Sequence, residues 1–120
     1  MEPDQLRIEH SNGTTGTPRV LRLNGPLTLQ TLFEFQKCVR AEEAPSTLVD
    51  LTEVPYIDSA GLGSLINVYV SCEKTGRRLA LVGPNERIMA LLRMTGVEKV
   101  FQIFQTLSEA QQGLSGASIA

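Results

Sequence analysis

Apolar and polar residues alternate in two segments near the start of the chain. Leu6 and Ile8 alternate with charged residues, and Leu21 and Leu23 alternate with polar residues in RVLRLNG. This period of two predicts two half-buried strands. The segment between them, SNGTTGTP, is rich in turn-forming residues, so we expect the strands to pair as a hairpin with a long loop.

Later segments are apolar without alternation, which is typical of central strands covered on both faces. STLVDL and RLALVG are two such runs. KVFQIFQ indicates one more strand, with Val100 and Phe104 among its apolar residues. Strands are therefore expected through the whole length of the chain.

Apolar residues at helical spacing predict four helices between and after these strands. Their expected N-terminal caps are Thr28, Asp58 or Ser59, Asn85 and Thr106. The first helix is expected to reach about Ala41, whereas the glycines at positions 76 and 96 end the second and third. Glu109 completes a capping box with the last of these caps and begins a short final helix.

The order of these elements, β-β-α-β-α-β-α-β-α, predicts one α/β domain. Strands alternate with helices after the N-terminal hairpin, so the β-sheet should be mixed and mostly parallel, packed against about four helices. We expect this domain to span residues 1–112. The small residues of GLSGASIA, at positions 113–120, are expected to form a disordered tail.

Composition and charge narrow the classes of partner. The 120 residues include 11 basic and 13 acidic side chains, and the net charge of −2 offers no basic field for nucleic acid or anionic lipid. No run approaches the roughly 18 apolar residues of a membrane span, and the N-terminus has no signal-peptide core. We therefore expect a cytoplasmic protein without a nucleic-acid or membrane partner.

Cysteine and histidine are too few and too scattered for a zinc site. Cys38 and Cys72 lie far apart in the chain, there is no CxxC motif, and His10 is the single histidine. We expect both thiols to be reduced, which fits a cytosolic location.

The segment YIDSAGLGSL, residues 56–65, is an unusual start for a helix. Gly61 and Gly63 each cost a helix about 1 kcal/mol relative to alanine, and with Ala60 they leave the first turn almost without side-chain bulk. One explanation is close packing of this turn on a neighbouring strand. The other is room for a ligand or for another protein's backbone, and the residues themselves leave both explanations open.

The residues of this segment match no catalytic or nucleotide-binding motif well. Asp58 and Ser59 both stand where a helix cap belongs, and a serine nucleophile would need a nearby base that His10 is not placed to supply. The phosphate-binding lysine of a P-loop is absent, and Ile66 stands at the third glycine position of a dinucleotide fingerprint. Asp50 and Asp58 could pair on Mg²⁺, but acids at strand ends are more often caps or solvated. We expect no catalytic residue, cofactor or metal site.

The segment TLVDLTEVPYIDSAGLGSLINVY resembles the signature of the STAS domain family, in particular of bacterial anti-sigma-factor antagonists. In that family a buried strand ending in Asp is followed by a short loop and a motif that opens a helix. The strand corresponds here to residues 48–50. The motif corresponds to Asp58, Ser59, Ala60, Gly61, Leu62 and Gly63. RVLRLNGPL and the C-terminal half are also similar to the family, so the resemblance covers residues 6–112.

The resemblance implies a switched binding protein and not an enzyme. Ser59 is the implied phosphorylation site, and residues 58–63 are the implied partner-binding segment. The implied partners are an anti-sigma factor that is itself a serine kinase, and a phosphatase of the PP2C type. The unphosphorylated protein would bind the kinase and free a sigma factor, and phosphorylation would end that binding.

Two other functions are consistent with the same fold. One is a non-cycling STAS scaffold in a stress-signalling complex, or the small cytosolic subunit of a lipid-transport ATPase. The other is a small-molecule sensor, against which the lack of a phosphate-binding lysine argues.

Some residues depart from the family pattern or from the helix stripe. Thr28 stands where many members have an acid, and Ala60 replaces a second hydroxyl, so Ser59 is the only hydroxyl at the motif's centre. Val68 and Val70 lie off the main stripe of their helix. We expect them to be buried against an adjacent helix, and an apolar contact surface for a partner is the alternative.

Overall fold

The chain folds around one sheet with helices on both of its faces. The structure is a computed structural model that describes residues 5–11, 17–41 and 44–117. Within these residues, the elements in chain order are β1 (Arg7–Ser11), β2 (Arg19–Asn24), α1 (Leu32–Arg40), β3 (Ser46–Glu53), α2 (Ser59–Lys74), β4 (Arg78–Val82), α3 (Glu86–Met94), β5 (Gln102–Phe104) and α4 (Leu107–Ala117). Their order confirms the predicted alternation of strands and helices.

The strands lie in the sheet in the order in which they occur in the chain, β1-β2-β3-β4-β5. β1 and β2 are antiparallel, and every later neighbouring pair is parallel. The predicted hairpin and the mixed, mostly parallel sheet are therefore confirmed. β3 is the central strand, as its continuous apolar run indicated.

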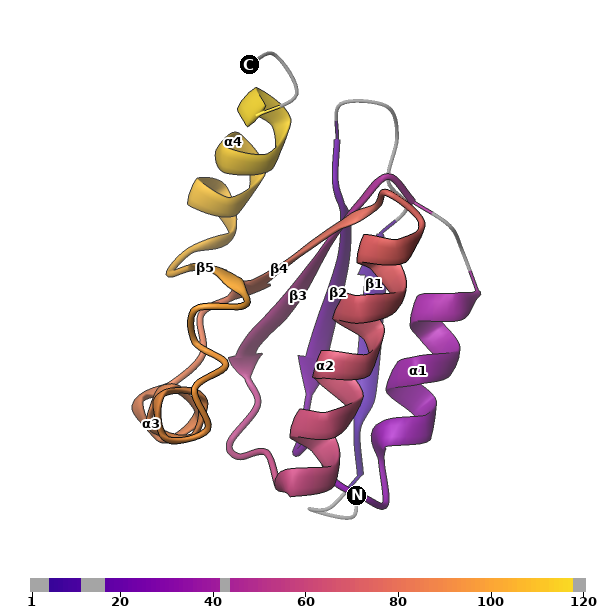
Figure 1. The fold of residues 1–120 in the computed structure, drawn as a ribbon. Coiled ribbons are helices and arrows are strands. Elements are labelled where there is room, and N and C mark those ends of the chain that lie inside the picture. Colours follow the sequence, from indigo (N-terminus) through magenta and orange to yellow (C-terminus); the bar gives the residue numbers. More distant parts are fainter. Residues whose placement is uncertain (1–4, 12–16, 42–43, 118–120) are drawn as a thin grey trace.

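The two faces of the sheet are covered unequally. On one face, Leu21, Val49 and Leu81 pack against apolar residues of α1, α2 and α3 in the main core. On the other face, Leu48 and Val82 pack against α4 in a smaller core. α4 contacts β3, β4 and β5 but neither β1 nor β2 to a comparable extent, and Figure 1 shows α1 and α2 side by side on the opposite face. The second face therefore has a covered half and an open half.

Helix α1 begins later than the sequence indicated. Thr28 is not its cap, because residues 28–31 first form a turn in which the Thr31 hydroxyl accepts a hydrogen bond from the Thr28 N–H at 2.9 Å. The Leu32 N–H then donates to the Thr28 carbonyl oxygen at 2.8 Å. The helix starts at Leu32 with Thr31 in the N-cap position.

Strand β5 is shorter than expected. Val100 lies in a turn, where its N–H donates to the Val97 carbonyl oxygen at 2.9 Å, and only the three residues of β5 pair with β4. The predicted caps of α3 and α4 are correct, because Asn85 accepts from the Ile88 N–H at 2.8 Å and Thr106 accepts from the Glu109 N–H at 3.1 Å.

The C-terminal segment differs from the expected tail at 113–120. Helix α4 continues to Ala117, and its Leu114 is only 3% exposed. A Cβ on Gly113 would lie 2.6 Å from the ring of Phe104, so this glycine permits close packing on β5. Helix α4 therefore continues past the expected end of the domain at residue 112, and positions 118–120 lie outside the described residues.

Candidate functional site at the start of helix α2

The connection from β3 to α2 is held against the segment that follows β2. Leu27 and Ile57 form a parallel bridge. The Leu27 N–H donates to the Tyr56 carbonyl oxygen at 3.3 Å, and the Asp58 N–H donates to the Leu27 carbonyl oxygen at 3.2 Å. Asn85, besides capping α3, donates its side-chain amide to the carbonyl oxygens of Val54 and Pro55. The start of α2 is thus fixed by two other parts of the chain.

Asp58 is the N-cap of α2, which settles one of the alternatives left open by the sequence. Its Oδ1 accepts a hydrogen bond from the Gly61 N–H at 2.7 Å. Its Oδ2 accepts from the Leu29 N–H at 3.1 Å. One carboxylate therefore both caps the helix and ties the segment before α1 to it.

Ser59 is the first residue of α2 and not its cap. Its side chain is exposed, and within the part of the chain that the structure describes its hydroxyl makes no hydrogen bond. The cap position is filled by the neighbouring Asp58, so the hydroxyl has no structural role at the helix terminus. It stands exposed beside the free N–H groups of the first turn.

The two glycines of the motif have different explanations. A Cβ on Gly61 would overlap the carbonyl oxygen of Leu27, so this glycine is required for packing. A Cβ on Gly63 would meet nothing within 4 Å, so no packing reason exists for this exposed glycine. The packing explanation is correct for the first glycine and wrong for the second.

The remaining motif residues divide by burial. Leu62 belongs to the main core and Ala60 is half-buried against it. The exposed members of the predicted partner-binding segment, residues 58–63, are Ser59 and Gly63. Any direct contact of this segment with another protein therefore centres on these two positions.

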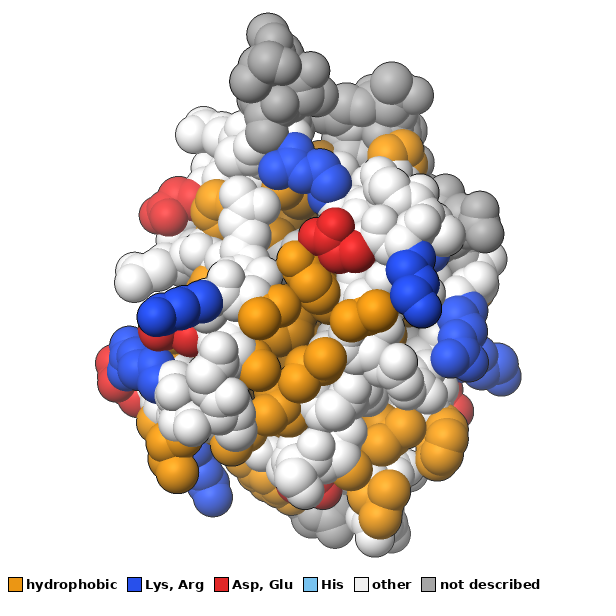
Figure 2. Space-filling view, in the orientation of Figure 1, with side chains coloured by type: hydrophobic (Ala, Val, Ile, Leu, Met, Phe, Trp, Pro, Cys, Tyr) orange, Lys and Arg blue, Asp and Glu red, His pale blue; other side chains and the backbone are white. Residues whose placement is uncertain are grey.

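Exposed apolar residues lie beside this exposed pair. Leu29, in the turn before α1, and Phe33, in the first turn of α1, are 62% and 68% exposed, and the Leu29 N–H donates to Asp58. On α2, Val68 is buried as expected, whereas Val70 is 42% exposed, so its expected burial is wrong. Figure 2 shows hydrophobic side chains gathered over α2 and around the start of α1.

Asp50 and Asp58, which could have formed a metal-binding pair, have separate partners. Asp50 accepts from Thr52 and faces Arg22, whereas Asp58 bonds the two backbone N–H groups described above. Among the described residues, no group of three or more His, Cys, Asp or Glu side chains could hold a metal ion. None of the helices described is long and apolar enough to cross a membrane.

Sequence reasoning missed a buried arginine that supports α1. Arg19 on β2 is almost completely buried, and its guanidinium donates to the Val39 carbonyl oxygen at 3.2 Å and to that of Cys38. A cation at these last carbonyls also suits the helix dipole. In the sequence, Arg19 is indistinguishable from the exposed Arg22 of the same strand.

A family model for the STAS domain matches residues 5–110. This chain belongs to the STAS domain family. A relative in Thermotoga maritima that bears the name of an anti-sigma factor antagonist is 37% identical over 97 residues, covering 78% of this chain and 86% of that protein. The anti-sigma-B factor antagonist of Listeria monocytogenes is 36% identical over 76 residues, covering 63% of this chain and 67% of its own.

Solved structures agree with the fold of this STAS domain. An anti-sigma factor antagonist from Mycobacterium paratuberculosis superposes with a TM-score of 0.80 at 21% identity, covering 93% of this chain and 96% of the other. SpoIIAA, an anti-sigma factor antagonist solved in its unphosphorylated form, gives a TM-score of 0.76 at 17% identity, with coverage of 92% and 97%. At these identities the likeness concerns the fold alone.

Proposed function

We propose that this STAS domain is an anti-sigma factor antagonist whose binding is switched by phosphorylation of Ser59. In this proposal the unphosphorylated protein binds an anti-sigma factor that is a serine kinase, and so frees a sigma factor. A PP2C-type phosphatase restores the unphosphorylated form. The observation that carries the proposal is the exposed hydroxyl of Ser59, which has no structural partner because Asp58 caps the helix.

The position of Ser59 suits a phosphate that leaves the fold intact. A phosphoserine carries a charge of about −1.5 to −2 and strong acceptor oxygens. At the first residue of α2, those oxygens would meet backbone N–H groups and the positive end of the helix dipole. The Asp58 carboxylate opposes this attraction, but it is already engaged by two N–H groups and is held in place.

The same phosphate would disrupt a protein docked on the surrounding surface. Ser59 and Gly63 are exposed, and the apolar Leu29 and Phe33 lie on the adjoining segment. A partner that covers these residues would bring its own surface within reach of the serine hydroxyl. A phosphate adds about two negative charges at this position. In the complex these charges would be removed from water and held against the partner's surface, which weakens binding, whereas in the free protein they stay solvated.

The kinase assay tests this proposal directly. The purified domain is incubated with ATP and an anti-sigma serine kinase from the same genome, and phosphate incorporation is followed by mass spectrometry. We expect one phosphate per chain, lost in Ser59→Ala and retained in Ser108→Ala. Ser108 is a matched control because it is an exposed serine in the first turn of another helix, α4.

Binding to the same kinase tests the switch. We expect unphosphorylated protein and Ser59→Ala to bind alike, and the phosphorylated protein to bind at least about tenfold more weakly. Equal binding of the phosphorylated form would contradict the switch. Phosphate that remains in Ser59→Ala would contradict the assignment of the site, and a stable complex without any phosphate transfer would favour the non-cycling scaffold.

A further inference from the structure

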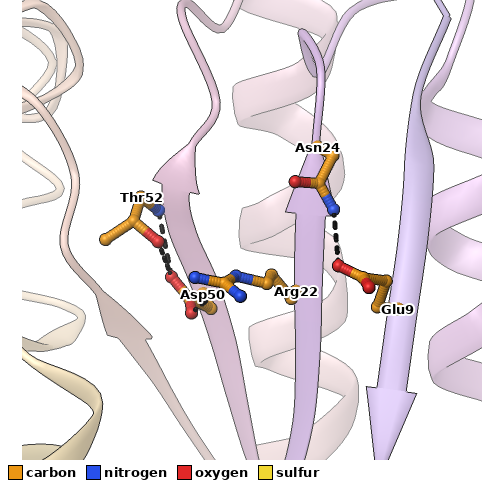
Figure 3. Close-up of polar contacts among 5 residues, drawn as sticks. All are labelled: Glu9, Arg22, Asn24, Asp50 and Thr52. Carbon is orange, nitrogen blue, oxygen red and sulfur yellow. Dashed lines mark hydrogen bonds and ion pairs between the residues drawn. The ribbon is translucent and has the colours of Figure 1, made fainter.

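A row of alternating charges crosses the face of the sheet opposite α1 and α2. Glu9 on β1 lies opposite Arg22 on β2, and Arg22 lies beside Asp50 on β3. These three residues share the face on which α4 covers Val82. Figure 3 shows their side chains on neighbouring strands, with the guanidinium extending toward Asp50.

The open half of this face forms a cavity of about 580 Å³. Its floor is the charged row, and its walls are β1 on one side and the start of α4 on the other, where Thr106 and Gln111 contribute polar groups. This volume is in the range of small-molecule sites, roughly 300–1,000 Å³. The carboxyl ends of parallel strands β3 and β4 meet here, which is the common place for ligands in open α/β sheets.

Asp50 is a buried carboxylate with unused hydrogen-bonding capacity. It is only 4% exposed, and its Oδ1 accepts from the Thr52 N–H at 3.0 Å and from the Thr52 hydroxyl. Its Oδ2 has one polar partner among the described residues, Arg22 Nε at 3.6 Å, which is beyond hydrogen-bond distance. This oxygen is therefore available to accept a hydrogen bond from a donor outside the chain.

The two other charged groups also have capacity to spare. Within the described part of the chain, Arg22 makes only this ion pair, so its terminal N–H groups can donate to a ligand. Glu9 accepts one hydrogen bond, from Asn24 at 3.1 Å, through one of its two oxygens. The row therefore places one guanidinium group, which can donate hydrogen bonds, between two carboxylates, which can accept them.

We propose that this cavity binds a small zwitterion with a second positive charge, of the class of basic α-amino acids. The ligand carboxylate pairs with the Arg22 guanidinium, and its two ammonium groups pair with Asp50 and Glu9. Glu9 and Asp50 lie on strands separated by β2, roughly 10 Å apart at the backbone. A ligand with a long side chain is needed to reach both, and its methylene groups would lie on Val20 and Val82.

This binding site is independent of the proposed phosphorylation switch. Ser59 lies on α2, which packs on the opposite face of the sheet. Loss of one property leaves the other intact, so Ser59→Ala is expected to retain the ligand.

A titration followed by ¹H–¹⁵N NMR tests the site, with L-lysine as the probe. Two compounds serve as controls, L-norleucine, which lacks the side-chain amine, and cadaverine, which lacks the carboxylate. We expect saturable shifts of amides in β1–β3 and at the start of α4, and affinity for L-lysine at least about tenfold above that for either control. If L-lysine causes no saturable shift, or if a control binds equally well, the proposal is wrong.

Two substitutions connect the binding to the charged row. Arg22→Gln changes a half-exposed side chain, and Asp50→Asn keeps an oxygen for Thr52 while it removes the charge. Each is expected to weaken L-lysine binding at least about tenfold. Arg93→Gln, at an exposed ion pair with Glu98, is the matched control and should bind as wild type. The spectrum of each variant reports its fold, and unchanged binding by a folded Arg22→Gln protein would overturn the proposal.

Discussion

The carbonyl oxygen of Leu27 occupies the space that a side chain on Gly61 would need. The same oxygen accepts a hydrogen bond from the Asp58 N–H, so it is held in place by the start of the helix it touches. Close approach of two backbones therefore determines where α2 begins. Gly63, two residues later, has no such neighbour.

Gly61→Ala is expected to destabilise the protein by about 1–3 kcal/mol, because its Cβ would displace the backbone at Leu27. The gain in helix propensity, about 1 kcal/mol, offsets only part of this cost. Urea unfolding of both proteins measures the difference in unfolding free energy.

Gly63→Ala is the matched control for this substitution. It adds the same methyl group to the same helix, but in open space, and should stabilise the protein by up to about 1 kcal/mol. The same variant should bind the kinase less well if the exposed glycine provides room for the partner. Equal effects of the two substitutions on stability would contradict the packing role assigned to Gly61.

Asp58→Asn is expected to separate the two functions of the Asp58 carboxylate. The side-chain oxygen of an asparagine can still accept a hydrogen bond from the Gly61 N–H. Its NH₂ group would then face the Leu29 N–H, and because both groups are donors this second hydrogen bond would be lost. Hydrogen exchange should therefore accelerate at the Leu29 amide and change little at Gly61. Thr106→Ser, which keeps the hydroxyl that caps α4, provides the comparison for a substitution at a cap away from this segment.

Local sequence patterns predicted the elements well, and the reasons are visible at particular residues. The caps at Asn85 and Thr106 use side chains that bond within three residues. Gly76 and Gly96 have positive φ angles of 72° and 76° just after α2 and α3, which few other residues adopt. These features depend only on residues close together in the chain, so a local sequence pattern can predict them.

The late start of α1 comes from a local turn at residues 28–31, whereas other errors involve contacts between segments far apart in the chain. Whether Gly61 or Gly63 is needed for packing depends on the position of Leu27, which lies more than thirty residues earlier in the chain than either glycine. The small residues after position 112 resemble a disordered tail, but Gly113 lies against Phe104 of β5 and Leu114 packs on the second face of the sheet. The serine motif itself was found through its resemblance to a family, because spacing alone could not separate a cap from an exposed hydroxyl.

Cys72 is expected to react with thiol reagents at least about tenfold more slowly than Cys38 at pH 8. Burial raises the pKa of the Cys72 thiol, and the nearby Arg77 and Arg19 offset only part of this effect. Less thiolate and less access both slow the reaction. Mass spectrometry after timed alkylation measures the two rates, and equal rates in denaturant serve as the control.

The raised pKa of Cys72 also predicts a direction for stability against pH. The neutral thiol is favoured in the folded state, so its contribution is complete below the pKa of an unfolded thiol, about 8.5. It is lost as the pH rises through the higher folded-state pKa. Unfolding free energies of wild type and Cys72→Ala, measured across this alkaline range, should show a smaller decline for the variant.

Leu114→Ala is expected to destabilise the protein by about 2–4 kcal/mol, which tests the extended length of α4. Leu114 is buried with Ala80 and Val82 on the second face of the sheet, and its carbonyl oxygen accepts from the Arg78 guanidinium at 3.3 Å. Truncating it would leave a cavity over β4.

Leu29→Ala is the matched control for this change, because it truncates the same side chain at an exposed position. Its effect on the unfolding free energy should stay within about 0.5 kcal/mol. If both variants unfold at the urea concentration of the wild type, Leu114 does not pack on the sheet. A large loss for Leu114→Ala alone would establish that α4 packs on the sheet as far as Leu114, which the sequence pattern by itself does not distinguish from a tail.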